Sequence, residues 1–414
     1  MKRLKILLLS LLTCILILLA GYKYIYHIPG KNFLVKNTRA VYVNENFNRK
    51  SIKPLEELLV KIGEESQIED LKKEKKYIKN IYILYFGRME LLNEHRVGVL
   101  DPGLFYPLFK SRLGKYFEKS GDYYILKEKY REKYSSGKEV FLKGYRGYFL
   151  VSDSKSDFEG VLSNIGETNE NLIALKKRNK DNIFGKLLID FSGTRGELWG
   201  LKGSVLTGNY ESEKLSMDNK LVGEGDIIEL FKNQPEERKM GKYLGENRIY
   251  ISSSDFGKAA EIFTASIPKE QKVIFDIWES FSGASVEEFL GDIDGEIVGD
   301  IEKNQWIIPL KETKRFEKLF MILGKSKRLK IGNISLMIQG NNIYQGKEKL
   351  SPGIGGTLSK DQFFQGDISL DLLDRSFSEE SKISIKGRAE NDYLNLHTEL
   401  GEETLDDILS KIKK

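Results

Sequence analysis

The longest apolar run of the chain lies at its amino terminus. Seventeen consecutive uncharged residues, Ile6 to Tyr22, are mostly Leu and Ile. In a helix they would extend about 26 Å, which is the short end of a bilayer span. Tyr22, Tyr24 and Tyr26 follow, and aromatic rings favour the headgroup boundary. We therefore expect residues 1–30 to form an N-terminal transmembrane anchor whose partner is the lipid bilayer.

The residues after the apolar run favour retention of this segment over its cleavage. A signal peptidase site needs small residues at positions minus three and minus one. Cleavage after Ala20 would place Leu18 at minus three, and cleavage after Gly21 would place Leu19 there. A retained signal-anchor is the favoured prediction, and a cleaved, secreted protein is the alternative. Cys14 lies inside the run, where it behaves as a small hydrophobic residue.

The basic residues near the amino terminus indicate the orientation. Lys2, Arg3 and Lys5 form the densest positive cluster beside the apolar run. Positive residues favour the cytoplasmic side, so the rest of the chain is expected outside the cytoplasm. A single Cys in 414 residues leaves no intrachain disulfide, which suits a bacterial envelope better than a eukaryotic secretory compartment. We predict a single-pass membrane protein of the bacterial envelope.

Beyond the anchor, the pattern alternates between strand-like and helix-like segments. Residues 40–43 and 81–86 are rich in β-branched and aromatic residues, which is typical of buried strands. Between such runs, apolar residues recur at the spacing of an amphipathic helix. The predicted fold class is α+β, with mixed, mainly antiparallel sheets and packed helices. The polar stretch 165–186 divides a first domain, residues 31–180, from a second region, residues 187–414; a helix packed between domains is the alternative for that stretch.

Two internal echoes indicate duplication of a supersecondary unit. The segment at 148–158 resembles that at 249–256, since each is a strand followed by a Ser/Asp run that can cap a helix. A longer echo relates about 197–230 to about 366–412, each a glycine-marked strand, a turn, a strand and a helix. Recurrence in one order favours duplication. Chance remains the alternative, because capped helices often follow strands.

These arrangements carry a resemblance to known proteins. The segments Ile249 to Phe263 and Ser285 to Val298 combine an alternating strand, a Ser/Asp-capped helix, a short helix ending in Leu-Gly and a Gly-Glu strand. In this they resemble uncharacterised families of bacterial membrane-anchored envelope proteins. The resemblance implies an N-terminal anchor and a duplicated α+β extracytoplasmic body. It brings no catalytic residues.

Composition excludes several classes of chemistry. One Cys and three His cannot build a Cys-based zinc site and leave little for histidine clusters. The net charge is +5, and without Lys2, Arg3 and Lys5 the remainder carries 5 − 3 = +2. Nucleic-acid binding needs a concentrated basic face, so no nucleic-acid partner is predicted.

Three acidic residues are the candidates for a metal site. Asp292, Asp294 and Glu296 alternate along the sequence, so a strand would point them to one face, where oxygen ligands could hold Ca²⁺ or Mg²⁺. The favoured alternative is an exposed hairpin around the Asp294-Gly295 turn, with Ile293 and Ile297 facing the core. No cofactor is predicted.

Motifs for catalysis are missing from the sequence. The chain has no Gly-x-Ser-x-Gly and no His-Glu-x-x-His, and the glycines at 353, 355 and 356 are not followed by Gly-Lys-Ser/Thr. Paired carboxylates for hydrolysis are always available among 61 acids, because they need spatial rather than sequential proximity. The prediction is a non-catalytic binding or assembly protein for another envelope protein or a cell-wall or lipid component. A carboxylate-dependent envelope hydrolase is the alternative.

Aromatic residues supply candidates for a binding surface. Phe105, Tyr106, Tyr123 and Tyr124 are interleaved with polar residues, and Phe363 and Phe364 form a further pair. Such residues suit binding surfaces as well as cores. Both interpretations remain open from the sequence.

Overall fold

The computed structural model describes the chain in two compact units. The described residues are 27–87, 95–135, 137–178, 182–235, 238–323, 327–331, 334–346, 348–353, 355 and 358–412. The first unit ends at Asp190 and the second begins at Phe191. The predicted anchor, Ile6 to Tyr22, lies outside the described residues, and none of the helices within them combines the length and apolar character of a membrane span.

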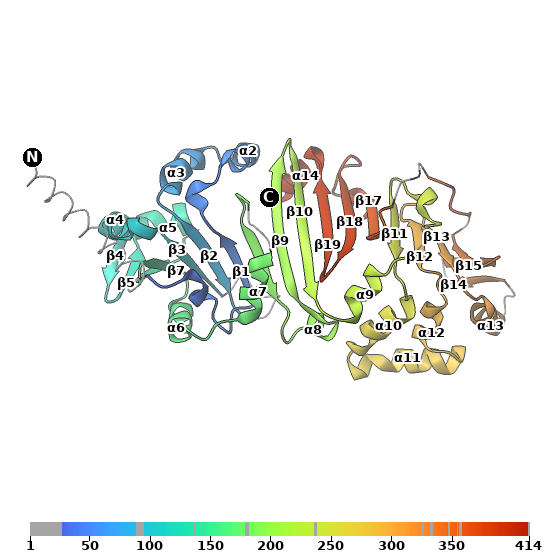
Figure 1. The fold of residues 1–414 in the computed structure, drawn as a ribbon. Helices are drawn as coiled ribbons and strands as arrows, with labels where there is room; N and C mark the ends of the chain where they lie inside the picture. The colour runs from blue at the N-terminus through green and yellow to red at the C-terminus, as the bar shows by residue number, and fades with distance from the viewer. Residues whose placement is uncertain are drawn as a thin grey trace, which may run out of the picture. The chain divides into compact units, whose positions relative to one another are not determined.

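The first unit is built on one antiparallel sheet (Figure 1). Following the hydrogen-bonded neighbours, its strand order is β8-β1-β2-β3-β7-β6-β5-β4. The strands are β1 (Ala40–Asn44), β2 (Asn80–Tyr85), β3 (Arg96–Asp101), β4 (Phe117–Ser120), β5 (Tyr123–Leu126), β6 (Phe141–Tyr145), β7 (Tyr148–Ser152) and β8 (Lys186–Asp190). The predicted strands at 40–43 and 81–86 are confirmed as β1 and β2, with β2 ending one residue earlier, at Tyr85.

Helices of the first unit differ sharply in how much they bury. They are α2 (Lys53–Lys61), α3 (Ser66–Lys75), α4 (Tyr106–Arg112), α5 (Glu128–Ser135), α6 (Lys155–Ser163) and α7 (Glu170–Arg178). Ser154 caps α6 by accepting a hydrogen bond from the Asp157 amide, as the sequence indicated. Helix α6 buries Phe158 and Val161, whereas α2 and α3 bury no residue. Helix α6 therefore packs on one face of the sheet, whereas α2 and α3 stay near the surface.

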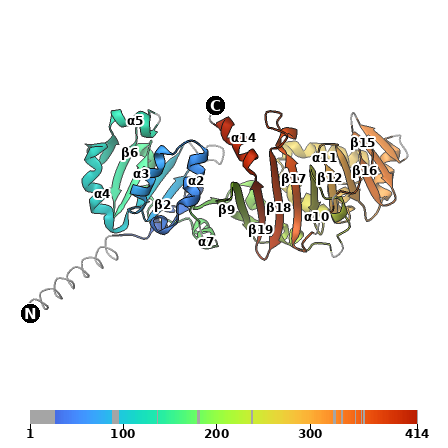
Figure 2. The same cartoon turned by 90° about the horizontal axis from the view of Figure 1, so that it is seen from above.

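The second unit has a longer antiparallel sheet. Its order is β9-β10-β19-β18-β17-β11-β12-β13-β16-β15-β14, and in Figure 2 its strands follow one another across the view. The strands are β9 (Leu201–Glu211), β10 (Lys214–Gly223), β11 (Arg248–Ser252), β12 (Glu296–Asp300), β13 (Gln305–Pro309), β14 (Arg328–Ile331), β15 (Ile334–Gln339), β16 (Asn342–Gln345), β17 (Gln362–Ser369), β18 (Lys382–Glu390) and β19 (Tyr393–Leu400). The prediction of an α+β protein with mainly antiparallel sheets is confirmed.

Helices of the second unit gather beside the middle of its sheet and at the end of the chain. They are α8 (Arg195–Leu198), α9 (Asp226–Lys232), α10 (Phe256–Ala265), α11 (Lys269–Ser282), α12 (Val286–Gly291), α13 (Lys314–Ile322) and α14 (Glu402–Ile412). Asp255 caps α10, and Ser285 with Glu288 forms a capping box on α12. Figure 1 shows α10, α11 and α12 together, with α11 outermost.

A constant sequence offset relates two hairpin-plus-helix segments of the second unit. The hairpin β9-β10 closes at the pair Glu211 and Lys214, and the hairpin β18-β19 closes at Glu390 and Tyr393. Both differences, 390 − 211 and 393 − 214, equal 179. Adding 179 to the residue numbers of α9 gives 405–411, which lie within α14. Over residues 201–232 and 380–411 it aligns seven identical residues without a gap, so geometry and sequence agree on one alignment.

Strand connectivity repeats over a longer range. In the first unit β1, β2 and β3 pair in sequence, and β7 then pairs with the other side of β3. Strand β8 pairs with the other side of β1. In the second unit β11, β12 and β13 likewise pair in sequence, and β16 pairs with the other side of β13. Strand β17 pairs with the other side of β11. Under this correspondence β7 matches β16 and β11 matches β1. The segments 148–158 and 249–256 therefore share local form without holding equivalent positions.

Candidate functional site

One face of the first unit's sheet carries apolar side chains that form the floor of a hollow. Strand pairing places Leu100 opposite Phe149, Val151 opposite Leu142, and Leu126 opposite Phe117. Because side chains alternate between the faces of a strand, these six lie on one face. Tyr123, on the other face, stacks on Phe158 of α6 with ring centroids 6.1 Å apart. The hollow is thus opposite the α6 core.

Helix α4 and the segment before β2 supply the walls. Tyr106 stacks on Phe149 with centroids 4.7 Å apart, and Tyr77 meets Phe109 edge to face at 5.9 Å. Leu108 lines the hollow from a half-exposed position. The hollow has a volume of about 570 Å³, within the range of roughly 300–1,000 Å³ for small-molecule sites. It can accommodate an apolar group.

Charged residues lie at the rim of this hollow. Asp70 and Glu74 come from α3, and Arg112 comes from the end of α4. All three side chains belong to exposed residues. Among the described residues, none forms an ion pair with Arg112. An apolar interior with a positive and two negative groups at its rim matches the two-part chemistry of an amphiphile.

The first described residue, His27, is held firmly against the same unit. Its Nε2 lies 3.1 Å from Oδ1 of the buried Asp101, and its ring stacks on Tyr148 at 4.6 Å. The Tyr148 hydroxyl donates to the Ile28 carbonyl at 2.8 Å. Asp101 also accepts from Asn80 at 2.6 Å. Five residues after the predicted membrane run, the chain is therefore fixed to the sheet.

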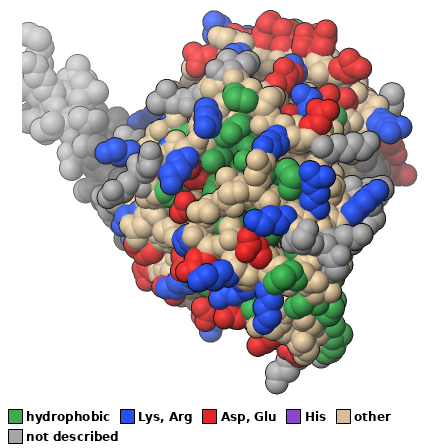
Figure 3. Space-filling view, turned by 90° about the vertical axis from the view of Figure 1, so that its right-hand side faces the viewer, with side chains coloured by type: hydrophobic (Ala, Val, Ile, Leu, Met, Phe, Trp, Pro, Cys, Tyr) green, Lys and Arg blue, Asp and Glu red, His purple; other side chains and the backbone are tan. Residues whose placement is uncertain are grey.

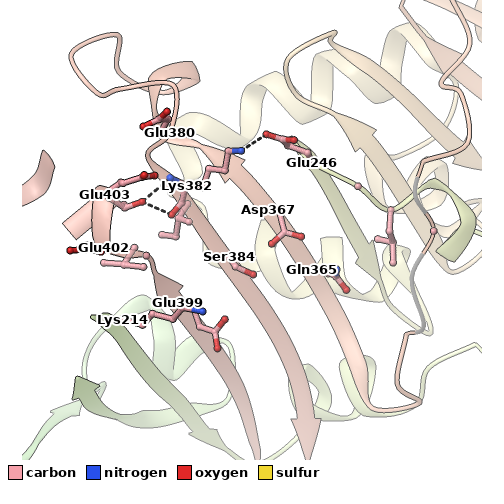
Figure 4. A pocket seen from close by; sticks show the side chains of 17 residues that line it. Lys214, Glu246, Gln365, Asp367, Glu380, Lys382, Ser384, Glu399, Glu402 and Glu403 are labelled. Carbon is pink, nitrogen blue, oxygen red and sulfur yellow. Dashed lines mark hydrogen bonds and ion pairs between the residues drawn. The ribbon is translucent and has the colours of Figure 1, made fainter. Parts of the chain in front are cut away.

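A second cavity, in the other unit, is highly charged. It has a volume of about 600 Å³ and lies around β17, β18, β19 and the start of α14. In Figure 4 the Lys382 ammonium reaches across to Glu246, at 2.6 Å. Lys214 is the other lysine of this cavity. The carboxylates that line the cavity are those of Glu246, Asp367, Glu380, Glu399, Glu402 and Glu403.

Protonation in the charged cavity does not favour acid catalysis. A hydrogen bond from His397 lowers the pKa of Glu399 below its ordinary value, whereas a general acid needs a raised pKa. The hydrogen bond to Glu246 raises the pKa of Lys382. A lysine acting as base or nucleophile needs a lowered pKa. These two side chains are set to stay ionised.

The three predicted metal ligands are separated by their surroundings. Asp292 is the C-cap residue after α12 and pairs with Arg315. The half-exposed Asp294 lies 3.5 Å from the Lys239 ammonium. Glu296 is buried and accepts from the Tyr250 hydroxyl at 2.9 Å and the Lys239 amide at 2.8 Å. In the part of the chain that the structure describes, no group of three or more metal-ligating side chains comes together.

The exposed-hairpin alternative for this segment is wrong. Gly295 has φ = 71° and ends a short connection from α12 into β12. The hairpin that follows joins β12 to β13 and turns at residues 301–304. Ile293 does face the core, at 3% exposure. Asp-Gly favours turns, but here the turn enters a strand whose first residue, Glu296, points inward to buried donors.

Helix α11 presents apolar side chains to solvent. Ile274 and Ile277 are 70% and 63% exposed, and Val273 and Phe281 are also exposed. At 100° per residue these four fall within one arc of about 100°. Met321 and Ile322 of α13 are exposed as well. Figure 3 shows hydrophobic side chains at the lower edge of its face, on the side where α11 and α13 lie in Figure 1.

The aromatic candidates divide between core and cavity. Tyr106 is buried beside the hollow, and Phe105 packs on Tyr77 at 5.2 Å while staying exposed. Phe363 is buried in a cluster with Leu201 and Leu394, and Phe364 packs against that cluster. Sequence reasoning missed the hollow's floor. The available signal was the run of apolar residues at 148–151, but Leu100, the strand partner of Phe149, is 149 − 100 = 49 residues away.

These features define a mixed α+β protein of two antiparallel units, with an apolar hollow in the first unit and a charged cavity in the second. No protein-family model matches the sequence, and no curated protein matches it. Crystal form III of TP0453 is similar at a TM-score of 0.29 and 12% identity, over 48% of this chain and 82% of that one. Crystal form I of TP0453 is similar at a TM-score of 0.28 and 13% identity, over 48% and 82%. Similarity at this level carries no functional argument.

Proposed function

We propose that this chain is a single-pass, membrane-anchored protein of the bacterial envelope that binds an apolar ligand without catalysing a reaction. The observation that carries the proposal is the apolar hollow of about 570 Å³ in the first unit. Small-molecule sites are concave and mostly apolar, with a few polar groups for orientation. The hollow has this character, with Arg112, Asp70 and Glu74 at its rim.

The distance along the chain from the apolar run to His27 supports a position close to the membrane. Five residue steps separate Tyr22 from His27, which span at most about 18 Å when fully extended. Since His27 is held by Asp101 and Tyr148, the first unit would stay within that reach of the anchor. A ligand could then pass between bilayer and hollow over a short path.

The body of this protein is proposed to be a duplication. The 179-residue offset joins two hairpins with identical closing registers, and the strand connectivity repeats over β1–β8 and β11–β17. Gene duplication explains both with one event.

A carboxylate-dependent hydrolase is the second candidate, and the charged cavity is the observation in its favour. Six carboxylates and two lysines line it. The lowered pKa of Glu399 and the raised pKa of Lys382 oppose acid, base and nucleophile roles for these two residues. A binding function therefore remains the better supported proposal.

Fractionation of the native host tests the anchored, binding-competent protein. We expect the full chain in the membrane fraction, with an intact N-terminus by mass and a body digested by protease added outside spheroplasts. Extraction of the purified protein should release an apolar small molecule identified by mass spectrometry. A soluble product beginning near Gly21 or Tyr22 would remove the anchor. Digestion only after lysis would reverse the topology, and an extract without apolar ligand in a correctly anchored protein would count against binding.

A further inference from the structure

We infer that the hollow of the first unit takes the single acyl chain of a zwitterionic, lysophospholipid-type amphiphile from the bilayer. The inference rests on the proposed function and specifies its ligand. The apolar floor receives the chain, and the charged rim receives the headgroup. Each part has its own structural support and its own test.

The size and lining of the hollow select one chain. At roughly 30 Å³ for each water-sized group, a volume of about 570 Å³ holds about 19 such groups. That is one long acyl chain; two such chains would need nearly twice the space. The floor is made by Leu100, Phe149, Val151, Leu142, Leu126 and Phe117. With Tyr106 and Phe109 beside them, an acyl chain would lose little by leaving the bilayer core.

The rim selects a headgroup with both charges. Arg112 is exposed at the end of α4 without an ion pair to any described residue, and guanidinium groups bind phosphate with two parallel hydrogen bonds. Asp70 and Glu74 lie on successive turns of α3, so their carboxylates can share one ammonium group. A phosphate next to an amine meets all three groups. A purely anionic headgroup would face two carboxylates.

The short distance along the chain between the apolar run and the first unit indicates that the ligand comes from the bilayer. His27, the first described residue, comes five residues after an apolar run whose length suits a membrane. His27 is held through Asp101 and Tyr148 on β3 and β7. These two strands also carry Leu100, Phe149 and Val151 of the floor. The residues that hold His27 and these floor residues of the hollow therefore lie on the same two strands.

Photocrosslinking from the membrane tests the acyl-chain site. The full chain is placed in phosphatidylcholine nanodiscs that contain lysophosphatidylethanolamine with a diazirine near the end of its acyl chain. We expect crosslinks on peptides spanning residues 96–152. Leu108→Trp, which fills the hollow from a half-exposed position, should reduce them at least fivefold. Leu104→Trp is the matched control, because Leu104 is 61% exposed and does not line the hollow.

Competition with unlabelled amphiphiles of equal chain length tests the headgroup. Lysophosphatidylethanolamine should compete about tenfold better than lysophosphatidylglycerol or the free fatty acid. Arg112→Gln should remove most of this preference, and Glu74→Gln should lessen the disadvantage of lysophosphatidylglycerol. Lys110→Gln, an exposed position of the same helix outside the hollow, should change neither value.

The outcomes separate this inference from the proposed function. Equal crosslinking in Leu108→Trp and Leu104→Trp, with both variants folded, overturns the acyl-chain site. Equal competition by all three amphiphiles overturns the headgroup assignment. If the chain fails to stay with the nanodiscs yet crosslinks monomeric lysolipid in the hollow, the anchor is wrong and the site stands. If it stays with the nanodiscs and crosslinks only within residues 1–26, the anchor stands and the site is wrong.

Discussion

Asp218 of β10 and His397 of β19 face each other as register partners, with Asp218 Oδ1 2.9 Å from His397 Nδ1. They are also equivalent positions of the internal repeat, because 397 − 218 is again 179. A residue that pairs with its own equivalent lies on a local twofold axis. The two repeats therefore meet around this ion pair, with Leu215 and Leu221 pairing Leu400 and Leu394 on either side.

This pair should make the stability of the second unit depend on pH. Burial opposes protonation of His397, but hydrogen bonds to Asp218 and Glu399 outweigh it and raise the pKa. A raised folded-state pKa contributes stability that is present below the unfolded pKa of about 6.5 and is lost as pH rises through the folded value. We expect His397→Gln to cost about 0.5–1 kcal/mol at pH 5.5 and much less at pH 8.5.

Urea unfolding followed by tryptophan fluorescence measures this effect, since Trp199, Trp278 and Trp306 all belong to the second unit. His95→Gln, in the first unit, serves as the control. A penalty that is equal at both pH values would mean that His397 acts through packing alone.

The buried Tyr250 and Glu296 pair should be important for stability. Tyr250 is fully buried, and burial raises its pKa to about 12. Its hydroxyl donates to Glu296, which is also buried. Tyr250→Phe leaves that carboxylate with one donor fewer, so we expect a loss of about 1–3 kcal/mol in urea unfolding. Tyr393→Phe, whose partner Glu390 is exposed, should cost less than about 0.5 kcal/mol.

Truncation of a side chain on the floor of the apolar hollow should lower the stability far more than truncation of one on its wall. Phe149 is 3% exposed and packs in a cluster with Tyr106, Leu113 and Leu142. Truncation to Ala should cost about 3–5 kcal/mol. Leu108→Ala, from a half-exposed position, should cost less than about 1 kcal/mol. Thermal unfolding of the two variants measures the contrast, and equal losses would mean that Leu108 belongs to the core.

The exposed face of α11 should tolerate charge without loss of stability. Ile274 and Ile277 contact mainly solvent, so Ile274→Lys combined with Ile277→Lys should change the unfolding free energy by no more than about 0.5 kcal/mol. The same substitutions should reduce self-association in light scattering, because exposed apolar patches promote it. Lysine at Phe275, on the inward side of α11, is the contrasting change. If Ile274→Lys is as damaging as Phe275→Lys, the face is buried by a partner.

Local features of this fold were predictable because neighbouring residues determine them. The caps at Ser154, Asp255 and Ser285 use side chains that bond amides within three residues. The repeat was visible because Leu215 and Leu221 recur at strand spacing as Leu394 and Leu400. In each case the physical cause lies within a short window of sequence.

Features made by distant pairing were not predictable. Leu100 meets Phe149 only because β3 pairs with β7, and no local pattern specifies that partner. Glu296 was placed on an exposed hairpin because Asp294-Gly295 favours a turn, yet amides of Lys239 and Met240 draw its carboxylate inside. A sequence window around residue 296 does not contain those donors. The charged cavity likewise draws its residues from positions 214 to 404.

The pairing of β10 with β19 also sets an order of events during synthesis. Strand β10 ends at Gly223 and its partner begins at Tyr393, so 393 − 223 = 170 residues must be added before the two can pair. At about 5–20 residues per second this takes roughly 9–34 s. Throughout that interval one edge of β10 stays open, and open edges are sites of aggregation. A chain that ends before Lys382 lacks both β18 and β19 and leaves this edge of β10 unpaired, so we expect it to aggregate more readily than the full chain.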